Sequence, residues 1–168
     1  MWNNILGQAN RQPNNQITSL PYPEEPADFS LNISQVQLLE RFFNMYLIPR
    51  GHWDFWRQIT IKFDRNLAYP AGMISETKTL RLRPEYANPG ILAHEFSHLS
   101  YYLLAEAQKR WFVEDYRAAM KMDVLLQFLD SKNSYMNTSM IEAHAEIFRY
   151  LGNQMPVSLR AYYPKLTY

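Results

Sequence analysis

The pentapeptide His94-Glu95-Phe96-Ser97-His98 has the residue types and the spacing of a metal-binding site. Within a helix, two histidines four residues apart lie on one face, and this spacing lets both imidazoles bind a single Zn²⁺ ion. Glu95 follows the first histidine directly, where it can reach a metal-bound water and accept its proton. The motif therefore predicts a hydrolytic zinc site of the zinc-peptidase kind, with one Zn²⁺ per chain.

A catalytic zinc ion needs a third protein ligand and one position open to water. The chain has no cysteine, so a histidine or a carboxylate must supply the ligand. Glu142 and Glu146 share a helical face, whereas His144 is rotated by about 200° from Glu142. We favour Glu142 as the ligand and Glu146 as the acceptor of a hydrogen bond from a zinc-bound histidine, with the reverse assignment as the alternative. We expect His144 at the surface or at the rim of the cleft.

Helices must position these residues, and their limits are predicted from hydrophobic periodicity and capping residues. Asn88 followed by Pro89 is a strong helix start, and the helix that it opens should run to about Ala107 and carry both motif histidines. Further helices are predicted over residues 34–47, 111–129, 138–152 and 157–162.

Three short strands are predicted before the metal-binding helix. Residues 58–64 alternate apolar and polar side chains, as in a half-buried strand. Residues 72–75 and 79–83 read as two further strands joined by a polar turn. Strands followed by helices predict an α+β fold, in which a short mixed or antiparallel sheet packs on the metal-binding helix and further helices follow.

Composition bounds the organisation of the chain and its partners. Residues 1–28 are rich in Asn, Gln and Pro and predict an extended or disordered arm, and residues 29–168 predict one domain. The net charge is +1 without a basic cluster, so we expect neither a nucleic acid nor a membrane as partner, and we expect a monomer. No secretory signal or transmembrane run is visible, which predicts a cytoplasmic protein or one exported by a signal-independent route.

A downstream tyrosine and a glutamate-rich segment make a family resemblance specific. Tyr135 precedes Glu142 by seven residues, and the segment from Glu142 to Arg149, EAHAEIFR, begins 44 residues after His98. With the H-E-x-x-H motif, this arrangement resembles the catalytic domain of anthrax lethal factor and the secreted Pro-Pro endopeptidases. The resemblance covers roughly residues 58–168 and excludes the N-terminal arm.

The resemblance implies a small zincin-like domain of the gluzincin type. It implies that zinc is bound by His94, His98 and Glu142, with Glu95 as the general base. It further implies that Tyr135 stabilises the oxyanion or helps to protonate the leaving amine. Ser97 stands where the family usually has glycine, and we expect its side chain to narrow or polarise the floor of the cleft.

The sequence thus predicts a zinc endopeptidase that hydrolyses peptide bonds in a protein or peptide substrate, as a toxin, an effector or a secreted processing enzyme. The substrate is expected to bind in an extended form, by main-chain pairing with an edge strand formed by Gly72, Met73, Ile74 and Ser75. One alternative is an intracellular regulatory protease with one dedicated partner. Another is a catalytically inactive zincin-like module that binds its partner in the cleft.

Overall fold

The computed structural model describes residues 34–74 and 77–168. Within these residues the chain forms seven α-helices, a mixed three-stranded sheet and short 3₁₀-helices. In chain order they are α1 (Gln35–Met45), η1 (Arg50–His52), α2 (Trp53–Arg57), β1 (Thr60–Phe63), β2 (Ala71–Ile74), β3 (Thr79–Leu82), η2 (Pro84–Tyr86), α3 (Pro89–Tyr102), α4 (Glu106–Met120), α5 (Val124–Lys132), η3 (Ser134–Asn137), α6 (Met140–Leu151), η4 (Gly152–Gln154) and α7 (Val157–Arg160).

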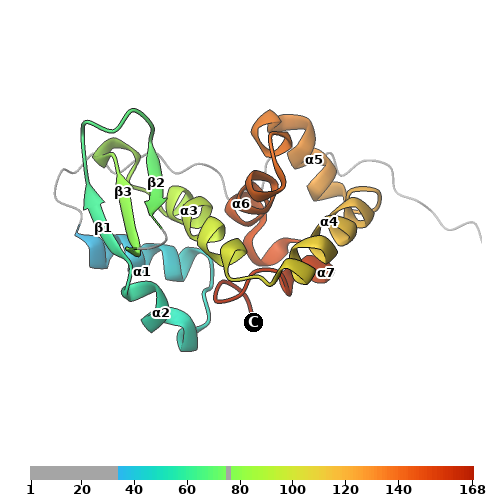
Figure 1. Ribbon diagram of the computed structural model, residues 1–168, viewed down its shortest axis with the longest axis horizontal. Coiled ribbons are helices and arrows are strands. Elements are labelled where there is room, and N and C mark those ends of the chain that lie inside the picture. Colours follow the sequence, from blue (N-terminus) through green and yellow to red (C-terminus); the bar gives the residue numbers. More distant parts are fainter. Residues whose placement is uncertain (1–33, 75–76) are drawn as a thin grey trace, which may run out of the picture.

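Helix α3, which carries the H-E-x-x-H motif, lies between two parts of the molecule (Figure 1). The sheet, α1 and α2 lie on one side of α3, and the helices from α4 to α7 lie on the other. The predicted α+β class is confirmed, with a small sheet beside the motif helix and further helices after it. The arm predicted over residues 1–28 falls outside the described residues.

The sheet has the strand order β1-β3-β2, so β2 is an edge strand. β1 pairs in parallel with β3, and β2 pairs antiparallel with it, with Gly72 opposite Arg81. The amide of Gln35 bonds the carbonyl of Ile59 (2.8 Å) and the N–H of Ile61 (3.3 Å), which occupies the edge beside β1. β2 lies at the other edge and contacts α3. All three predicted strands are present, with ends shifted by one or two residues.

Capping side chains explain where the helices of the site begin and end. Asn88 accepts a hydrogen bond from the N–H of Ile91 (2.9 Å) at the start of α3, as predicted. Ser139 caps α6 in the same way, and Gly152 ends it with φ of 47°, a left-handed conformation that suits glycine. The two helices that carry the candidate metal ligands therefore start on local sequence signals, and α6 also stops on one.

The helix predicted over residues 111–129 is wrong, because two helices occupy this part of the chain. α4 already begins at Glu106, so α3 ends at Tyr102 instead of continuing to about Ala107. α5 then begins after Asp123, whose carboxylate accepts from the N–H of Leu126 (2.9 Å). This N-cap satisfies a donor at a new helix start and divides the apolar stripe that suggested one continuous helix. The short helix α2 was not predicted.

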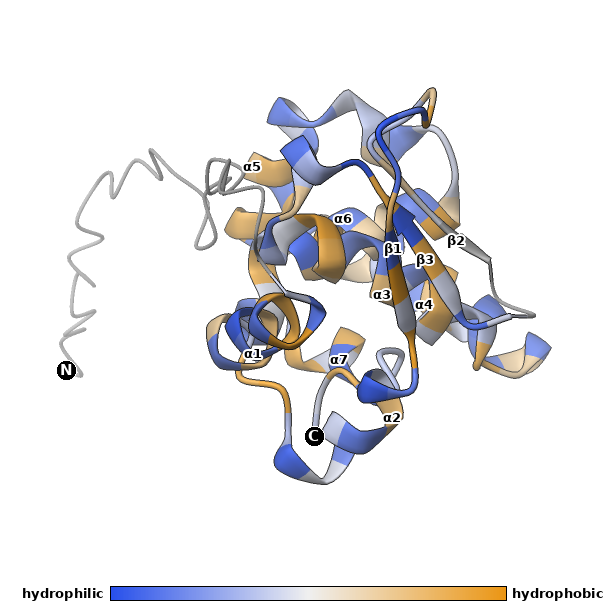
Figure 2. Ribbon diagram, turned by 90° about the vertical axis from the view of Figure 1, so that its left-hand side faces the viewer, coloured by the Kyte–Doolittle hydropathy of each residue, from blue (hydrophilic) through white to orange (hydrophobic). Residues whose placement is uncertain are grey.

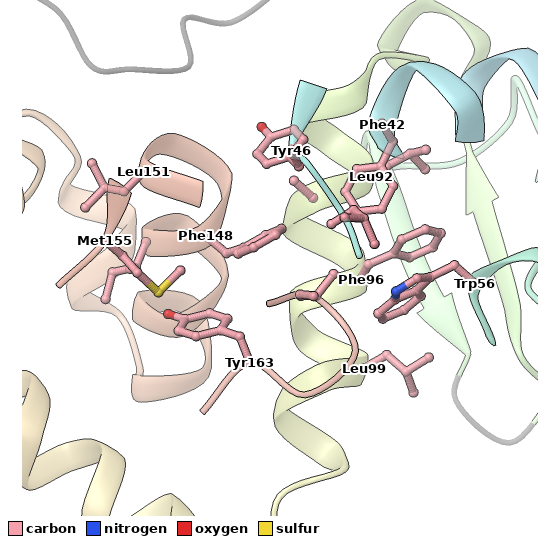
Figure 3. Packing of buried hydrophobic residues seen from close by; sticks show 14 of the residues in the cluster. Phe42, Tyr46, Trp56, Leu92, Phe96, Leu99, Phe148, Leu151, Met155 and Tyr163 are labelled. Atoms are coloured by element: carbon pink, nitrogen blue, oxygen red, sulfur yellow. The ribbon is translucent and has the colours of Figure 1, made fainter. Parts of the chain in front are cut away.

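The core is built around α3, which is buried on nearly all sides (Figure 3). Phe96 stacks on Trp56 with ring centroids 4.6 Å apart and meets Phe42 edge-on at 5.2 Å. Phe148 on α6 stacks at 5.3 Å on Tyr46, which directly follows α1, so aromatic rings join the two parts of the molecule. The α1 segment thus packs on both α3 and α6, and these two helices also contact each other directly.

Helix α1 is amphipathic, as expected of a helix that packs on this core with one face. Figure 2 shows hydrophobic and hydrophilic residues alternating around α1, whose buried face consists of Leu38, Leu39, Phe42 and Phe43. Among the helices of residues 34–74 and 77–168, none has both the length and the apolar character needed to cross a membrane.

Candidate metal centre

Three ligand atoms from α3 and α6 meet beside the core. Nε2 of His94 lies 3.0 Å from Nε2 of His98, and Oε2 of Glu142 lies 3.3 Å from the former and 3.5 Å from the latter. Ligands placed tetrahedrally at about 2.0–2.1 Å from Zn²⁺ are about 3.3 Å apart. The triad therefore has the dimensions of three corners of a zinc tetrahedron. Among the described residues, these three side chains have ligand atoms that lie close enough together to hold a metal ion.

Two buried atoms of the triad lack the hydrogen bonds that their burial requires. Oε2 of Glu142 and Nδ1 of His98 are buried, and neither has a hydrogen-bond partner among the described residues. An unsatisfied polar atom costs about 1–3 kcal/mol, and more when it is charged. A cation between the three side chains would remove this penalty for the carboxylate, so the residues fit a metal ion.

Glu146 contacts the other side of the first histidine. Its Oε1 lies 2.5 Å from Nδ1 of His94 and 3.4 Å from Nη1 of Arg149, and its side chain is 2% exposed. A carboxylate on the far nitrogen fixes the tautomer in which Nε2 of His94 is free to bind a metal. The two glutamates thus take the arrangement that we favoured, with Glu142 towards the metal position and Glu146 behind His94.

The charges of these groups are strongly linked. Burial lowers the pKa of His94, but the carboxylates of Glu142 and Glu146 outweigh burial and raise it to about 9. Burial and the positive charge of His94 lower the pKa of His98. Burial alone would raise the pKa of Glu142, yet the two imidazoles lower it. In the metal-free protein the two histidines therefore share one positive charge, which lies on His94, and a metal that binds Nε2 of His94 must displace the proton there.

Glu95 and Tyr135 complete the group of residues singled out by sequence. Glu95 is buried on α3, and its charge acts on both His94 and Tyr135. Tyr135 lies on η3 and is 51% exposed, with its ring centroid 6.1 Å from that of His94. Burial, followed by the charge of Glu142, raises the pKa of Tyr135. The phenol therefore keeps its proton at neutral pH and can donate it in a hydrogen bond.

The structure corrects the expected position of His144. Its side chain is fully buried and stacks on Tyr163 at 3.9 Å, whereas we expected it at the surface or at the rim of the cleft. Its rotation away from Glu142 points it into the core, because α6 is covered on that side by the C-terminal segment. Burial lowers the pKa of His144 to about 3, so the imidazole is neutral. It is no part of the metal triad.

Ser97 also lies elsewhere than expected. Its side chain is completely buried between α3 and α6 and does not form the floor of a cleft. Nε2 of His144 donates to the carbonyl of Tyr162 (2.7 Å), so Nδ1 accepts from the hydroxyl of Ser97 (2.8 Å). The hydroxyl therefore ties the motif helix to α6. Sequence reasoning missed this contact.

The predicted substrate strand lies at the sheet edge. β2 is antiparallel to β3, contacts α3 and contains Gly72, Met73 and Ile74, whereas Ser75 falls outside the described residues. A Cβ on Gly72 would come within 2.7 Å of the ring of Tyr69, so this position has no room for a side chain unless Tyr69 moves. Among the described residues β2 pairs with β3 alone, and a short edge strand of this kind can pair with an extended peptide.

Comparisons of this chain with protein-family models, with curated proteins and with solved structures give no match. The motif residues and the geometry of the site are therefore the observations that bear on function.

Proposed function

We propose that this protein is a zinc-dependent endopeptidase of the gluzincin type that hydrolyses peptide bonds in a protein or peptide substrate. The observation that carries the proposal is the triangle formed by His94, His98 and Glu142, whose sides of 3.0, 3.3 and 3.5 Å suit tetrahedral zinc. The motif glutamate and a phenol lie beside the same histidine. The resemblance to the lethal factor catalytic domain and the Pro-Pro endopeptidases supports the same class.

Each residue has a defined role in this reaction. A bound Zn²⁺ supplies Lewis acidity, which lowers the pKa of a water towards about 7 and polarises a carbonyl group. Glu95 accepts the proton of the attacking water and delivers it to the departing amine. Tyr135 donates its phenolic hydrogen to the carbonyl oxygen as negative charge develops there. Glu146 keeps His94 in the ligating tautomer.

The substrate would bind as an additional strand along β2 (Ala71–Ile74). Because β2 contacts α3, a peptide paired with this edge would run close to the motif helix. A toxin, an effector and a secreted processing enzyme are all compatible with this chemistry, as is a regulatory protease with one partner.

A peptide-library digest that compares the wild-type protein with the Glu95→Gln variant tests the proposal. The expected result is cleavage by the zinc-loaded wild-type protein and a loss of at least about 100-fold in the variant, since general-base catalysis contributes about 10²–10⁴-fold. Zinc binding by both proteins without cleavage by either would replace the enzyme with an inactive binding module. Equal cleavage by both would show that another group acts as the base.

A further inference from the structure

The side chain of Asn133 joins two parts of the candidate metal centre. Asn133 follows α5 and directly precedes η3, the 3₁₀-helix that carries Tyr135. Its Nδ2 donates a hydrogen bond to Oε2 of Glu146, and its Oδ1 accepts one from the backbone N–H of Tyr135 (3.1 Å). One amide therefore contacts both the carboxylate behind the first histidine and the segment of the candidate oxyanion donor.

Through Glu146, the side chain of Asn133 also acts on His94, one of the candidate metal ligands. Oε1 of Glu146 bonds His94 and also lies 3.4 Å from Arg149, which leaves Oε2 to be satisfied by another donor. Asn133 supplies that donor to a carboxylate that is 2% exposed. Because a carboxylate is planar, fixing Oε2 also fixes the direction in which Oε1 meets the imidazole.

The contact with Tyr135 acts on the backbone. Asn133 accepts a hydrogen bond from the backbone N–H of Tyr135, a donor at the start of η3 that the helix itself cannot satisfy. This bond also fixes the direction in which η3 follows α5. The ring of Tyr135 reaches the neighbourhood of His94 from this segment, with centroids 6.1 Å apart. A change in the first residues of η3 would therefore move the phenol relative to the metal ligands.

We propose that Asn133 is a positioning residue that holds the Glu146–His94 pair and the Tyr135 segment in one fixed arrangement. The inference rests on the proposed function, because it concerns how a metal ligand and an oxyanion donor are placed. An amide is suited to this role, since it offers a donor to the carboxylate and an acceptor to the N–H. An aspartate would keep the acceptor but would place a second negative charge against Glu146.

Zinc affinity of the full chain, measured by competition with a chelator at pH 8, tests the first contact without using activity. Asn133→Ala and Asn133→Asp are expected to weaken zinc binding by about 10-fold or more, the size of effect seen when partners of metal ligands are removed. In a Glu146→Gln background the further loss should be much smaller. Asn137→Ala, which changes an exposed asparagine of the same 3₁₀-helix, is the matched control and should bind zinc normally.

Turnover at saturating zinc tests the second contact. Asn133→Ala should lower kcat, whereas Asn133→Asp, which keeps the acceptor for the N–H of Tyr135, should lower it less. The loss of kcat caused by Asn133→Ala should disappear in a Tyr135→Phe background. Thermal unfolding of each zinc-free variant shows whether that variant folds. If Asn133→Ala does not fold, zinc affinity is compared between the wild-type protein and Asn133→Asp.

Normal zinc affinity in both Asn133 variants would overturn the proposal, and so would a loss of kcat that persists undiminished beside Tyr135→Phe. If no peptide is cleaved by the wild-type protein, the proposed function fails, but the zinc affinities still decide whether Asn133 holds Glu146.

Discussion

Replacing Ser97 with alanine tests how α3 and α6 are kept in register. The substitution removes a hydroxyl that is completely buried and that lies 2.8 Å from Nδ1 of His144. The imidazole cannot compensate by rotating, because its Nε2 is bonded to the carbonyl of Tyr162 and its ring stacks on Tyr163. Nδ1 is therefore left buried without a partner.

The expected loss follows from that unsatisfied acceptor. A buried polar atom that loses its partner costs about 1–3 kcal/mol, which lowers the melting temperature of a domain of this size by about 3–10 °C. Ser97→Gly should cost about 1 kcal/mol more, because glycine also weakens the helix interior. Zinc affinity should fall with both variants, since the contact joins α3 and α6, the two helices that carry the candidate metal ligands.

Urea unfolding of the zinc-free protein, followed by circular dichroism, measures this loss. Ser131→Ala is the matched control, because its hydroxyl donates to the carbonyl of Phe128 at an exposed site and should contribute less than about 0.5 kcal/mol. In a His144→Phe background Nδ1 is absent, and the backbone carbonyl of residue 144, which the hydroxyl also approaches (3.2 Å), still accepts from the hydroxyl of Tyr163 (3.0 Å). The cost of Ser97→Ala should therefore be clearly smaller in that background. An equal cost in both backgrounds, or no cost in the wild type, would show that the bond to Nδ1 does not stabilise the fold.

Three further predictions concern other parts of the molecule. Tyr163 is fully buried, and burial raises its pKa well above 10, so on raising the pH the unfolded chain loses this proton before the folded chain does. The free energy of unfolding should therefore fall above pH 10 by about 1.4 kcal/mol per pH unit. Denaturant titrations at several pH values should find a smaller slope in Tyr163→Phe. Asp123→Ala removes the N-cap of α5 and should lower the free energy of unfolding by about 1 kcal/mol, whereas unchanged stability would show that the cap is dispensable. Proline at Met73 or at Ile74 should raise KM in one of the two variants, because successive N–H groups of β2 point to opposite edges; unchanged cleavage by both would exclude substrate pairing with this strand.

Local signals account for the parts of the fold that could be predicted. Asn88 and Pro89 mark the start of α3, and Ser139 and Gly152 mark the ends of α6, because caps act on backbone groups within a few residues. The break between α4 and α5 was not predicted, because a long apolar stripe suggested one continuous helix and Asp123 was a single capping signal against it. Periodicity alone does not separate one long helix from two that pack on the same core.

Contacts between distant segments account for the parts that could not be predicted. Helical geometry gave the direction of His144 relative to Glu142, but whether that direction meets solvent or core depends on the C-terminal segment around Tyr163. Asn133 had no motif to mark it, and its bond to Glu146 exists only because η3 packs beside α6. The two histidines followed from the spacing of the H-E-x-x-H motif, whereas sequence spacing alone left Glu142 and Glu146 as alternatives. Only the packing of α6 on α3 brings Oε2 of Glu142 within 3.5 Å of Nε2 of both histidines.

Whether the three side chains bind zinc together can be measured by titrating the metal-free protein with Zn²⁺ in a calorimeter, beside the His94→Ala and Glu142→Ala variants. The wild-type chain should bind one ion, and each variant should lose most of the affinity, because each removes one corner of the triangle. Wild-type affinity in the Glu142→Ala variant, or no binding by the wild-type chain, would contradict the proposed metal centre.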